Sequence, residues 1–364
     1  MKQVLVIGAG RIGITVADLL AGSGAYAVTL ADRRPPSRDI AGVRVLALDA
    51  GDEAALAAAC AGQSAVIGTA PFYLNAGIAG AAKAAGAHYL DVTEDVATTG
   101  IVRRLAADAA TAFVPQCGLA PGFVGIVAAD LARRFDRAQA LRLRVGALPR
   151  FPLDRLKYNL TWSTDGLINE YCNPCLALRD GRPVELAPLE GLERLSLDGI
   201  EYEAFNTSGG LGTLAESLAG KVDTLDYKTI RYPGHADALK LLLEDLGLAR
   251  RRDLLKEIFE SSLPETAQDV VLVLVSATGD RRGHLTQETF TRAILGGSGP
   301  DDTAIQRTTA AGVCVALDLL LQGRLRQRGF VRQEDIALAD FLANRFAGPF
   351  AETAGGDERR RRRA

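Results

Sequence analysis

The sequence has few of the residues that build metal sites or disulfide frameworks. It contains three histidines and five cysteines, and Cys172 and Cys175 are the one pair with the spacing of a metal or redox motif. Because no second pair of this spacing accompanies them, no metal site is predicted. Five scattered cysteines are typical of a reducing compartment, and the expected location is the cytoplasm.

Charge is balanced, and long apolar runs are missing. The 42 Lys and Arg residues and 44 Asp and Glu residues leave a formal net charge of −2, which predicts no nucleic-acid partner. No apolar run approaches the length of a membrane span, and the chain enters a strand pattern at once without a secretory segment, so no membrane partner is expected. Residues 347–364, with five arginines at residues 359–363, are predicted to be a disordered tail.

The first twenty residues have the pattern of a dinucleotide-binding unit. An apolar run at residues 4–7 leads into Gly8-Ala9-Gly10-Arg11-Ile12-Gly13, and apolar residues then recur at helical spacing. In this pattern Gly8 permits a tight turn, Gly10 lets the backbone approach a pyrophosphate, and Gly13 lets the helix pack on the strand. The helix N-terminus offers free N–H groups to the phosphates. The alternative is a glycine turn that binds no cofactor.

The choice of cofactor depends on the end of the next apolar run. That run ends at Asp32, nineteen residues after Gly13. A carboxylate at this point accepts hydrogen bonds from the adenosine ribose and repels a 2′-phosphate, which favours NAD. Arg33 and Arg34 could hold a 2′-phosphate, so NADP stays open as an alternative.

Residues 1–125 continue with strands alternating with helices, which predicts an α/β fold with a Rossmann-type doubly wound parallel sheet. Cofactor and substrate should then lie beyond the carboxyl ends of the strands. The cofactor-binding residues expected at these ends are Gly8, Gly10, Arg11, Ile12, Gly13, Asp32, Arg33, Asp49, Ala50, Thr69, Ala70, Pro71, Gly118 and Leu119.

The pattern changes after a helix expected at residues 122–134. Strands are expected at residues 141–148 and 157–162, and two more within residues 195–205 with a turn at residues 198–199. With a further strand at residues 270–278, followed by a turn at residues 279–280, they predict an inserted α+β domain with a mixed sheet. Further expected segments are helices at residues 98–110, 236–246, 252–261 and 303–321 and a mobile loop at residues 296–302. The predicted organisation is a dinucleotide-binding domain at residues 1–125, a substrate-binding and dimerisation domain at residues 126–302, and C-terminal helices at residues 303–346 that return to the first domain.

Several further stretches are more specific than the glycine turn. They are residues 68–72 (GTAPF), 89–92 (YLDV), 117–122 (CGLAPG), 158–163 (YNLTWS), 166–171 (GLINEY), 203–210 (EAFNTSGG) and 229–235 (TIRYPGH). These stretches occur in the same order as in the saccharopine dehydrogenase family, which the chain resembles, especially its lysine 6-dehydrogenase branch. The resemblance implies a Rossmann domain, an inserted substrate domain on a mixed sheet and NAD(P)-linked chemistry at a C–N bond. It also implies a homodimer formed through the second domain, or an oligomer built from such dimers.

Oxidation of an amine by hydride transfer needs a neutral nitrogen and a group that manages its proton. Asp91, at a predicted strand end, is the first candidate for orienting or deprotonating the amine, and Glu94 is the second. The alternative for Asp91 is a cap on the following turn. His235 is the best-placed imidazole, and its alternative is a cap on the next helix.

An amino-acid carboxylate favours a bidentate arginine. Arg231 is predicted to hold this carboxylate, and its alternative is a structural ion pair. Cys117 is expected to pack beside the nicotinamide rather than to act as a nucleophile. The other substrate-binding candidates are Phe72, Tyr73, Trp162, Asn206 and Thr207, and the alternative for Trp162 is a place in the core.

The leading hypothesis is an NAD-dependent L-lysine 6-dehydrogenase that acts on a small-molecule amino acid. The rival is a saccharopine dehydrogenase, whose substrate has three carboxylates and for which Arg144, Arg150 and Arg155 could supply further cations. A carboxynorspermidine-type reductase is a third reading. A non-catalytic NAD sensor is the alternative outside enzymes.

Overall fold

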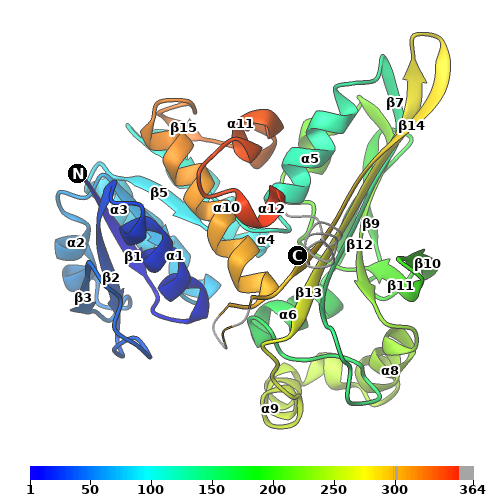
Figure 1. Ribbon diagram of the computed structural model, residues 1–364, viewed down its shortest axis with the longest axis horizontal. Coiled ribbons are helices and arrows are strands. Elements are labelled where there is room, and N and C mark those ends of the chain that lie inside the picture. The colour runs from blue at the N-terminus through cyan, green and yellow to red at the C-terminus, as the bar shows by residue number, and fades with distance from the viewer. Residues whose placement is uncertain (298, 300–301, 352–364) are drawn as a thin grey trace, which may run out of the picture. The chain divides into compact units, whose positions relative to one another are not determined.

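The computed structural model describes residues 1–297, 299 and 302–351, and the chain divides into two compact units (Figure 1). Unit 1 comprises Met1–Ile126 and Gln306–Ala351, and the described part of unit 2 comprises Val127–Ile305. The tail from residue 352 onward, with its arginine run, lies outside the described residues. Part of the loop expected at residues 296–302 also lies outside them.

Unit 1 is built on a seven-stranded sheet in the order β15-β6-β5-β4-β1-β2-β3, and every neighbouring pair is parallel. Its strands are β1 (Lys2–Ile7), β2 (Tyr26–Asp32), β3 (Val43–Ala47), β4 (Ala65–Gly68), β5 (His88–Asp91), β6 (Ala112–Val114) and β15 (Gly329–Phe330). The strand order reverses between β1 and β4, which is the place where doubly wound sheets bind ligands. The predicted parallel sheet is confirmed.

Helices cover both faces of this sheet. They are α1 (Arg11–Gly22), α2 (Glu53–Cys60), α3 (Asn75–Ala84), α4 (Val96–Ala106), α11 (Leu338–Leu342), α12 (Gly348–Ala351) and the 3₁₀ turns η1 (Phe72–Leu74) and η4 (Gln333–Asp335), while α5 (Phe123–Ala132) and α10 (Ala304–Leu321) each cross a unit boundary. Apolar residues of α2, α3 and α4 share one core with Leu5, Ile7 and Val66. Helix α10 contacts α1, where Cys314 Sγ lies 4.0 Å from the carbonyl oxygen of Val16.

Helix α10 corrects the statement that no apolar run approaches a membrane span. By length and composition it could cross a membrane, but 78% of it is buried inside the protein. Close packing also explains Gly312, because a Cβ at this position would lie 2.6 Å from the carbonyl oxygen of Cys117. A buried, apolar helix of this kind is typical of a protein core.

Unit 2 is built on an eight-stranded mixed sheet in the order β10-β11-β12-β7-β13-β14, with β8 pairing β12 and β9. Its strands are β7 (Arg137–Pro149), β8 (Cys175–Arg179), β9 (Arg182–Leu186), β10 (Glu193–Leu197), β11 (Ile200–Asn206), β12 (Val222–Arg231), β13 (Asp269–Arg281) and β14 (His284–Leu295). Strand β12 is parallel to β7 but antiparallel to β11, and β13 is antiparallel to β7. The predicted mixed sheet is confirmed.

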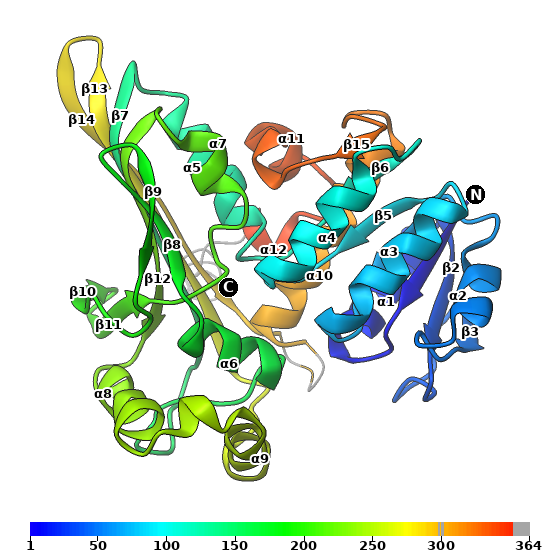
Figure 2. The same ribbon diagram turned by 180° about the vertical axis from the view of Figure 1, so that it is seen from behind.

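Alternate residues of β12 project to opposite faces of this sheet. Phe205 on β11, which pairs with Thr229, belongs to a core formed with the helices of unit 2. Ile230, on the opposite face, belongs to a second core with Tyr202 and Leu148. The helices are α6 (Thr164–Cys172), α7 (Leu214–Leu218), α8 (His235–Lys240), α9 (Arg252–Ser262), the π-helix η2 (Leu241–Asp245) and the 3₁₀ turn η3 (Leu248–Arg250). Figure 2 shows α6, α8 and α9 grouped at one end of unit 2.

Two local predictions in unit 2 are wrong. Residues 157–162 form no strand, since Lys157 has a φ of 54° and the segment contacts Pro264 through the backbone of Leu160 rather than joining the sheet. The turn predicted at residues 279–280 is also absent, because β13 continues to Arg281. Gly279 is required by close packing instead, as a Cβ there would lie 2.2 Å from the carbonyl oxygen of Arg137.

Candidate functional site

The glycine turn after β1 has the geometry of a phosphate-binding turn. Gly8 has a φ of 114°, and a Cβ there would lie 2.6 Å from the nitrogen of Ala70, so this position requires glycine. Gly13 is equally restricted, since its Cβ would lie 1.8 Å from the carbonyl oxygen of Gly8. Gly10 differs from both, because no atom lies within 4 Å of its would-be Cβ. The protein itself therefore leaves open the space that a close-approaching pyrophosphate would fill.

The N-terminus of α1 is available for an anion. Gly10 is its N-cap, and no side chain caps the helix. Arg11 is exposed and Ile12 is half-buried in the first turn. Helices α2 and α4, in contrast, are capped by Asp52 and Asp95. An uncapped N-terminus offers backbone N–H groups and the positive end of the helix dipole to a phosphate, so the residues fit the predicted dinucleotide.

Asp32 lies at the end of β2, beside this turn. Its carboxylate accepts hydrogen bonds from the backbone nitrogens of Ala9, at 2.7 Å, and of Arg34, at 2.9 Å. Each oxygen keeps further lone pairs for a ribose hydroxyl. The side chains of Arg33 and Arg34 are exposed. The ribose contact of Asp32 stays a prediction.

The other cofactor candidates follow the carboxyl ends of neighbouring strands. Thr69 donates to the carbonyl oxygens of Ile7 and Gly8, at 3.1 and 2.9 Å, and so joins the β4 end to the glycine turn. Asp49 is exposed in the turn before α2. The remaining cofactor candidates are Ala50 after β3, Ala70 and Pro71 after β4, and Gly118 and Leu119 after β6. The substrate candidates Phe72 and Tyr73 also follow β4, where Tyr73 is 65% exposed and Phe72 is half-buried.

Asp91 is fully buried at the end of β5, and both oxygens of its carboxylate accept hydrogen bonds from other protein groups. Oδ1 accepts from the nitrogens of Thr93, at 3.1 Å, and Gln116, at 2.9 Å, and Oδ2 accepts from the Tyr89 hydroxyl at 2.9 Å. Burial raises the pKa of Asp91 to about 6, although these hydrogen bonds oppose the shift. The contacts are those of the turn-capping alternative. Glu94 is half-buried in the loop between β5 and α4.

Cys117 lies beside Asp91 without the surroundings of a nucleophile. Its Sγ is 3.0 Å from the carbonyl oxygen of Val114 and 3.2 Å from Nε2 of Gln333. Burial raises the pKa of the thiol well above its ordinary value, and the charge of Asp91 adds to the shift. A buried thiol of this kind is protonated at neutral pH and unreactive.

Unit 2 contains a buried cluster around Arg231, which we call the Arg231 cluster and define as Tyr158, Glu170, Tyr171, Arg231 and His235. Arg231 is 2% exposed, and its Nε donates to the Tyr171 hydroxyl at 3.0 Å while Nη1 donates to the carbonyl oxygen of Ile230. Its Cζ lies 4.9 Å from the ring centroid of Tyr158. The carboxylate oxygen that pairs with Nη2 is Oε2 of Glu170. The two atoms are 3.7 Å apart, which is beyond hydrogen-bonding distance.

His235 is buried in this cluster with both ring nitrogens engaged. Nδ1 lies 2.7 Å from the carbonyl oxygen of Leu156, and Nε2 lies 3.1 Å from the Tyr171 hydroxyl. Since a carbonyl oxygen only accepts, Nδ1 carries the proton and Nε2 accepts from Tyr171. Burial and the charge of Arg231 lower the pKa of His235 to about 3. His235 is therefore neutral, and it orients Tyr171, which in turn orients Arg231.

Glu203 holds the turn that connects Arg231 to His235. It faces Arg231 across β11 and β12 and accepts hydrogen bonds from the nitrogens of Gly234, at 2.9 Å, and Ala236, at 2.7 Å. The left-handed φ of Gly234, 96°, permits this tight turn. The specific IRYPGH run thus brings a cation and a neutral imidazole into one cluster.

The other substrate candidates of unit 2 differ in their position relative to the Arg231 cluster. Trp162 donates from its indole nitrogen to the Tyr158 hydroxyl at 3.1 Å. The Thr207 hydroxyl lies 2.6 Å from that of Thr229 on the same sheet face as Arg231. Asn206 projects to the opposite face and donates to the carbonyl oxygen of Ala187. These roles stay predictions.

Sequence reasoning did not single out Glu170, which lies in the GLINEY stretch. Its side chain is 12% exposed, and Oε2 has no hydrogen-bond partner in the described part of the chain. Burial raises its pKa to about 7, against the opposing effect of Arg231. The available signal was an acidic residue in a helix whose neighbours, Ile168 and Tyr171, are apolar and buried.

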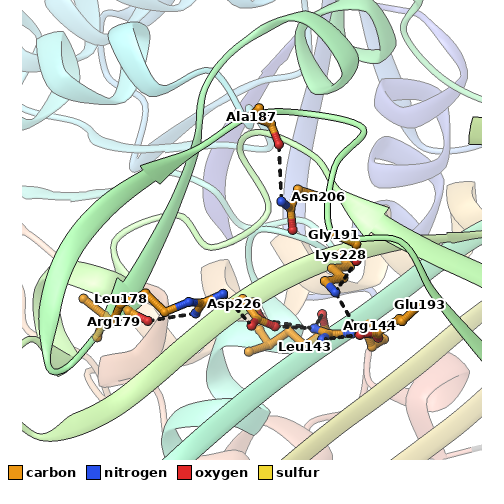
Figure 3. A network of polar contacts seen from close by, with 10 residues as sticks. All are labelled: Leu143, Arg144, Leu178, Arg179, Ala187, Gly191, Glu193, Asn206, Asp226 and Lys228. Carbon is orange, nitrogen blue, oxygen red and sulfur yellow. Dashed lines mark hydrogen bonds and ion pairs between the residues drawn. The ribbon is translucent and has the colours of Figure 1, made fainter. Parts of the chain in front are cut away.

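A second group of charges lies on the opposite face of β12, and we call it the charged network: Arg144, Arg179, Glu193, Asp226 and Lys228 (Figure 3). Arg144 donates to both oxygens of Glu193 and, at 2.7 Å, to Asp226. Arg179 donates to the other oxygen of Asp226 at 3.2 Å, and Lys228 donates to Glu193 at 2.8 Å. Every charged group in this network has an opposite charge within hydrogen-bonding distance.

Comparison with known proteins identifies relatives of both units. Residues 4–114 match the saccharopine dehydrogenase NADP binding domain, and residues 118–354 match the saccharopine dehydrogenase C-terminal domain. Among solved structures, the chain is similar to apo saccharopine dehydrogenase (L-Glu forming) from Saccharomyces cerevisiae, with a TM-score of 0.76 and 17% identity over 94% of this chain and 96% of that chain.

Weaker structural similarities follow. DAP dehydrogenase of C. glutamicum in complex with DAP has a TM-score of 0.48 and 12% identity over 96% of this chain and 98% of that chain. An engineered D-amino acid dehydrogenase bound to NADP⁺ has a TM-score of 0.49 and 16% identity over 96% and 99%. The similarity to the S. cerevisiae structure, at 17% identity, is evidence of a shared fold. The two domain matches extend over most of the sequence, and the chain therefore belongs to the saccharopine dehydrogenase family, as an NAD(P)-dependent amino-acid dehydrogenase.

Proposed function

We propose that the protein is an NAD-dependent L-lysine 6-dehydrogenase, which converts the ε-amine of lysine into allysine and ammonia. The observation that carries this proposal is the binding capacity of Arg231. Its guanidinium is buried and fixed by Tyr171 and by the backbone of Ile230, while Nη2 makes no hydrogen bond in the described part of the chain. A guanidinium held in this way suits one α-carboxylate.

The ion pairs of Arg144 support lysine over saccharopine. Saccharopine has three carboxylates, so its dehydrogenase needs more than one basic group. Arg144, one of the residues considered for this purpose, is held by Glu193 and Asp226 on the sheet face opposite Arg231. Of the two buried arginines among the described residues, Arg231 is the one with capacity for a ligand, while Arg150 and Arg155 are exposed.

The residues of unit 1 support binding of a nicotinamide dinucleotide. When bound, this cofactor accepts the hydride that leaves Cε of lysine. The open space at Gly10 and the uncapped α1 N-terminus would hold its pyrophosphate, and Asp32 would meet the adenosine ribose. Because a 2′-phosphate would face the negative charge of Asp32, we expect NAD to be preferred over NADP.

The two acidic candidates receive different roles in this proposal. The hydrogen bonds to Asp91 from Thr93 and Gln116 support a positioning role, in which Asp91 holds the loops after β5 and β6. Glu94, in the first of these loops, is the candidate that accepts the proton of the ε-ammonium. Lysine then donates hydride as the neutral amine, and water replaces nitrogen at the oxidised carbon.

An assay with deuterated lysine tests the proposal. With L-lysine deuterated at Cε, we expect the label to be transferred to the nicotinamide, ammonia to form in step with NADH, and kcat/KM to be higher with NAD than with NADP. NADH that forms from saccharopine alone, with glutamate as the co-product, would reject the lysine assignment. A clear preference for NADP would reject the role of Asp32.

Assembly and location complete the proposal. The family resemblance supports a homodimer formed through unit 2, and light scattering coupled to gel filtration measures its mass. The five cysteines are free thiols, which supports the cytoplasm as the location.

A further inference from the structure

The carboxylate of Glu170 is the one buried charge of the Arg231 cluster that the proposed reaction leaves without a task. It lies on α6, and its Oε2 atom is buried without a hydrogen-bond partner in the part of the chain that the structure describes. A buried carboxylate without hydrogen bonds is costly to maintain. Its presence beside Arg231 therefore calls for an explanation.

A purely structural ion pair does not account for the geometry. Oε2 of Glu170 and Nη2 of Arg231 are 3.7 Å apart, whereas Arg144 and Asp226 in the same unit approach to 2.7 Å and form a hydrogen bond. The stabilisation that a buried pair needs to offset desolvation comes from such hydrogen bonds. Both members of the Glu170–Arg231 pair thus retain unused capacity at neighbouring positions.

The unused capacity matches the two charges of an α-amino acid. The α-carboxylate and α-ammonium groups are attached to the same carbon, so they need a cation and an anion at adjacent positions. Arg231 offers donors at Nη2, and Glu170 offers an acceptor at Oε2. We propose that Glu170 binds the α-ammonium group of the substrate while Arg231 binds its α-carboxylate.

This inference rests on the proposed function only for the class of substrate, an L-α-amino acid. It adds a reason for the site of reaction, since a lysine held by both charges at its α-carbon is free to react at the distant ε-amine. It also predicts rejection of diamines and of α-N-acyl lysine, which lack one of the two charges.

The surroundings of Glu170 give its binding role a pH dependence. The groups that influence it are Arg231 and three neutral phenols, Tyr158, Tyr171 and Tyr227, whose pKa values are all raised mainly by burial, together with the thiol of Cys175, whose pKa burial raises to about 12. Arg231 is the sole charged member of this group. Because burial raises the pKa of Glu170 to about 7, ammonium binding should strengthen as the pH rises through neutrality.

Two unreactive ligands test the proposal in the full chain with NAD present. L-Norleucine has both α-charges but no ε-amine, and hexanoate has the carboxylate alone. By calorimetry we expect wild-type protein to bind norleucine about 10–150-fold more tightly than hexanoate, the range of a charged hydrogen bond. Glu170→Gln should abolish most of this preference and leave hexanoate binding unchanged.

The matched control is Asp165→Asn, which removes the same charge from the same helix, where Asp165 pairs with Lys256 at the surface. It should leave the preference for norleucine intact. Equal losses for both ligands in Glu170→Gln would make Glu170 a counter-ion only and overturn the proposal, as would a wild-type protein without the preference.

If Glu170→Gln does not fold, the wild-type protein still decides. A preference for norleucine that grows between pH 6 and pH 8 supports the proposal, and a preference that is constant over this range overturns it. The outcome is separate from the lysine assignment, because saccharopine also has a free α-amino-acid end. If the enzyme oxidises saccharopine alone, the proposed function is rejected. The comparison of norleucine with hexanoate still supports or overturns the role of Glu170 independently of that result.

Discussion

The two charged clusters of unit 2 lie on opposite faces of the same strand and differ in how well their hydrogen bonds are satisfied. In the charged network, Asp226 and Glu193 each accept from two cations. In the Arg231 cluster, the single ion pair spans 3.7 Å and leaves a buried oxygen unpaired. A satisfied network holds strands in register, whereas an unsatisfied one keeps capacity for a ligand. Burial of charge alone therefore does not mark a binding site.

The largest expected effect comes from breaking the charged network. Arg144→Ala leaves Asp226 and Glu193 with one cation each, and we expect the free energy of unfolding to fall by about 3–5 kcal/mol. The KM for lysine should not change. Urea unfolding and steady-state kinetics measure both quantities, with Arg142→Ala as a control at an exposed position of the same strand. A tenfold rise in KM would place Arg144 in the substrate site and favour saccharopine.

The converse experiment alters the Arg231 cluster. Arg231→Lys keeps the charge but loses the planar fork and the donor to Tyr171. We expect kcat/KM for lysine to fall about 10–150-fold, equivalent to 1.5–3 kcal/mol, while NAD affinity is retained. Arg144→Lys is the matched control and should leave kcat/KM intact. Lower thermal stability with unchanged lysine kinetics would return Arg231 to the role of a structural ion pair.

Asp91 extends the comparison to unit 1, as a buried carboxylate whose hydrogen bonds are filled. In Asp91→Asn the remaining oxygen can still accept from Thr93 and Gln116, and the amide can donate to Tyr89. We expect a loss of about 1 kcal/mol in stability and activity within tenfold of wild type. An activity loss of about 10²–10⁴-fold in a folded variant is the size expected of an acid or base that acts on the amine, and would restore Asp91 to that role.

The smallest expected effects concern the pH dependence of stability. Burial raises the pKa of Glu170 to about 7, so the folded protein binds this proton more tightly than the unfolded chain does. The resulting stabilisation of the folded state is present in acid and is lost as the pH rises toward 7. Burial alone would also raise the pKa of Glu193, but the hydrogen bonds and charges of Arg144 and Lys228 outweigh burial and lower it. The contribution of ionised Glu193 to the stability of the folded state is therefore present at neutral pH and is lost on acidification. Glu170→Gln should therefore stabilise the protein most near neutrality, whereas Glu193→Gln should destabilise it there. Thermal unfolding from pH 4 to pH 8 distinguishes the two, and parallel curves would contradict the contrast.

The sequence predicted the elements whose signals are local. The strand, glycine turn and helix at the start of the chain depend on contacts among neighbours, and Gly8 and Gly13 have the packing that their spacing indicates. Helix α4 was also predicted from local sequence. It begins at Val96 rather than at residue 98, because the Asp95 side chain caps it.

The elements that the sequence did not predict depend on distant partners. Strand β12 contains Asp226, Lys228 and Arg231, which interrupt an apolar pattern. Asp226 pairs with Arg144 and Lys228 pairs with Glu193, both on other strands, and no local pattern reveals these partners. The same limit explains why Glu170 was missed, since its significance depends on proximity to Arg231.

The edge strand of unit 1 has a consequence for the order in which the protein folds during synthesis. Strand β15, at residues 329–330, completes the sheet beside β6, and Gln333 donates to the carbonyl oxygen of Pro115. A ribosome therefore delivers residues 127–305 of unit 2 before this edge can close. The nascent sheet keeps the open side of β6 available to other strands throughout that interval. A chaperone that shields this edge would have its longest period of action between the synthesis of residue 114 and that of residue 330.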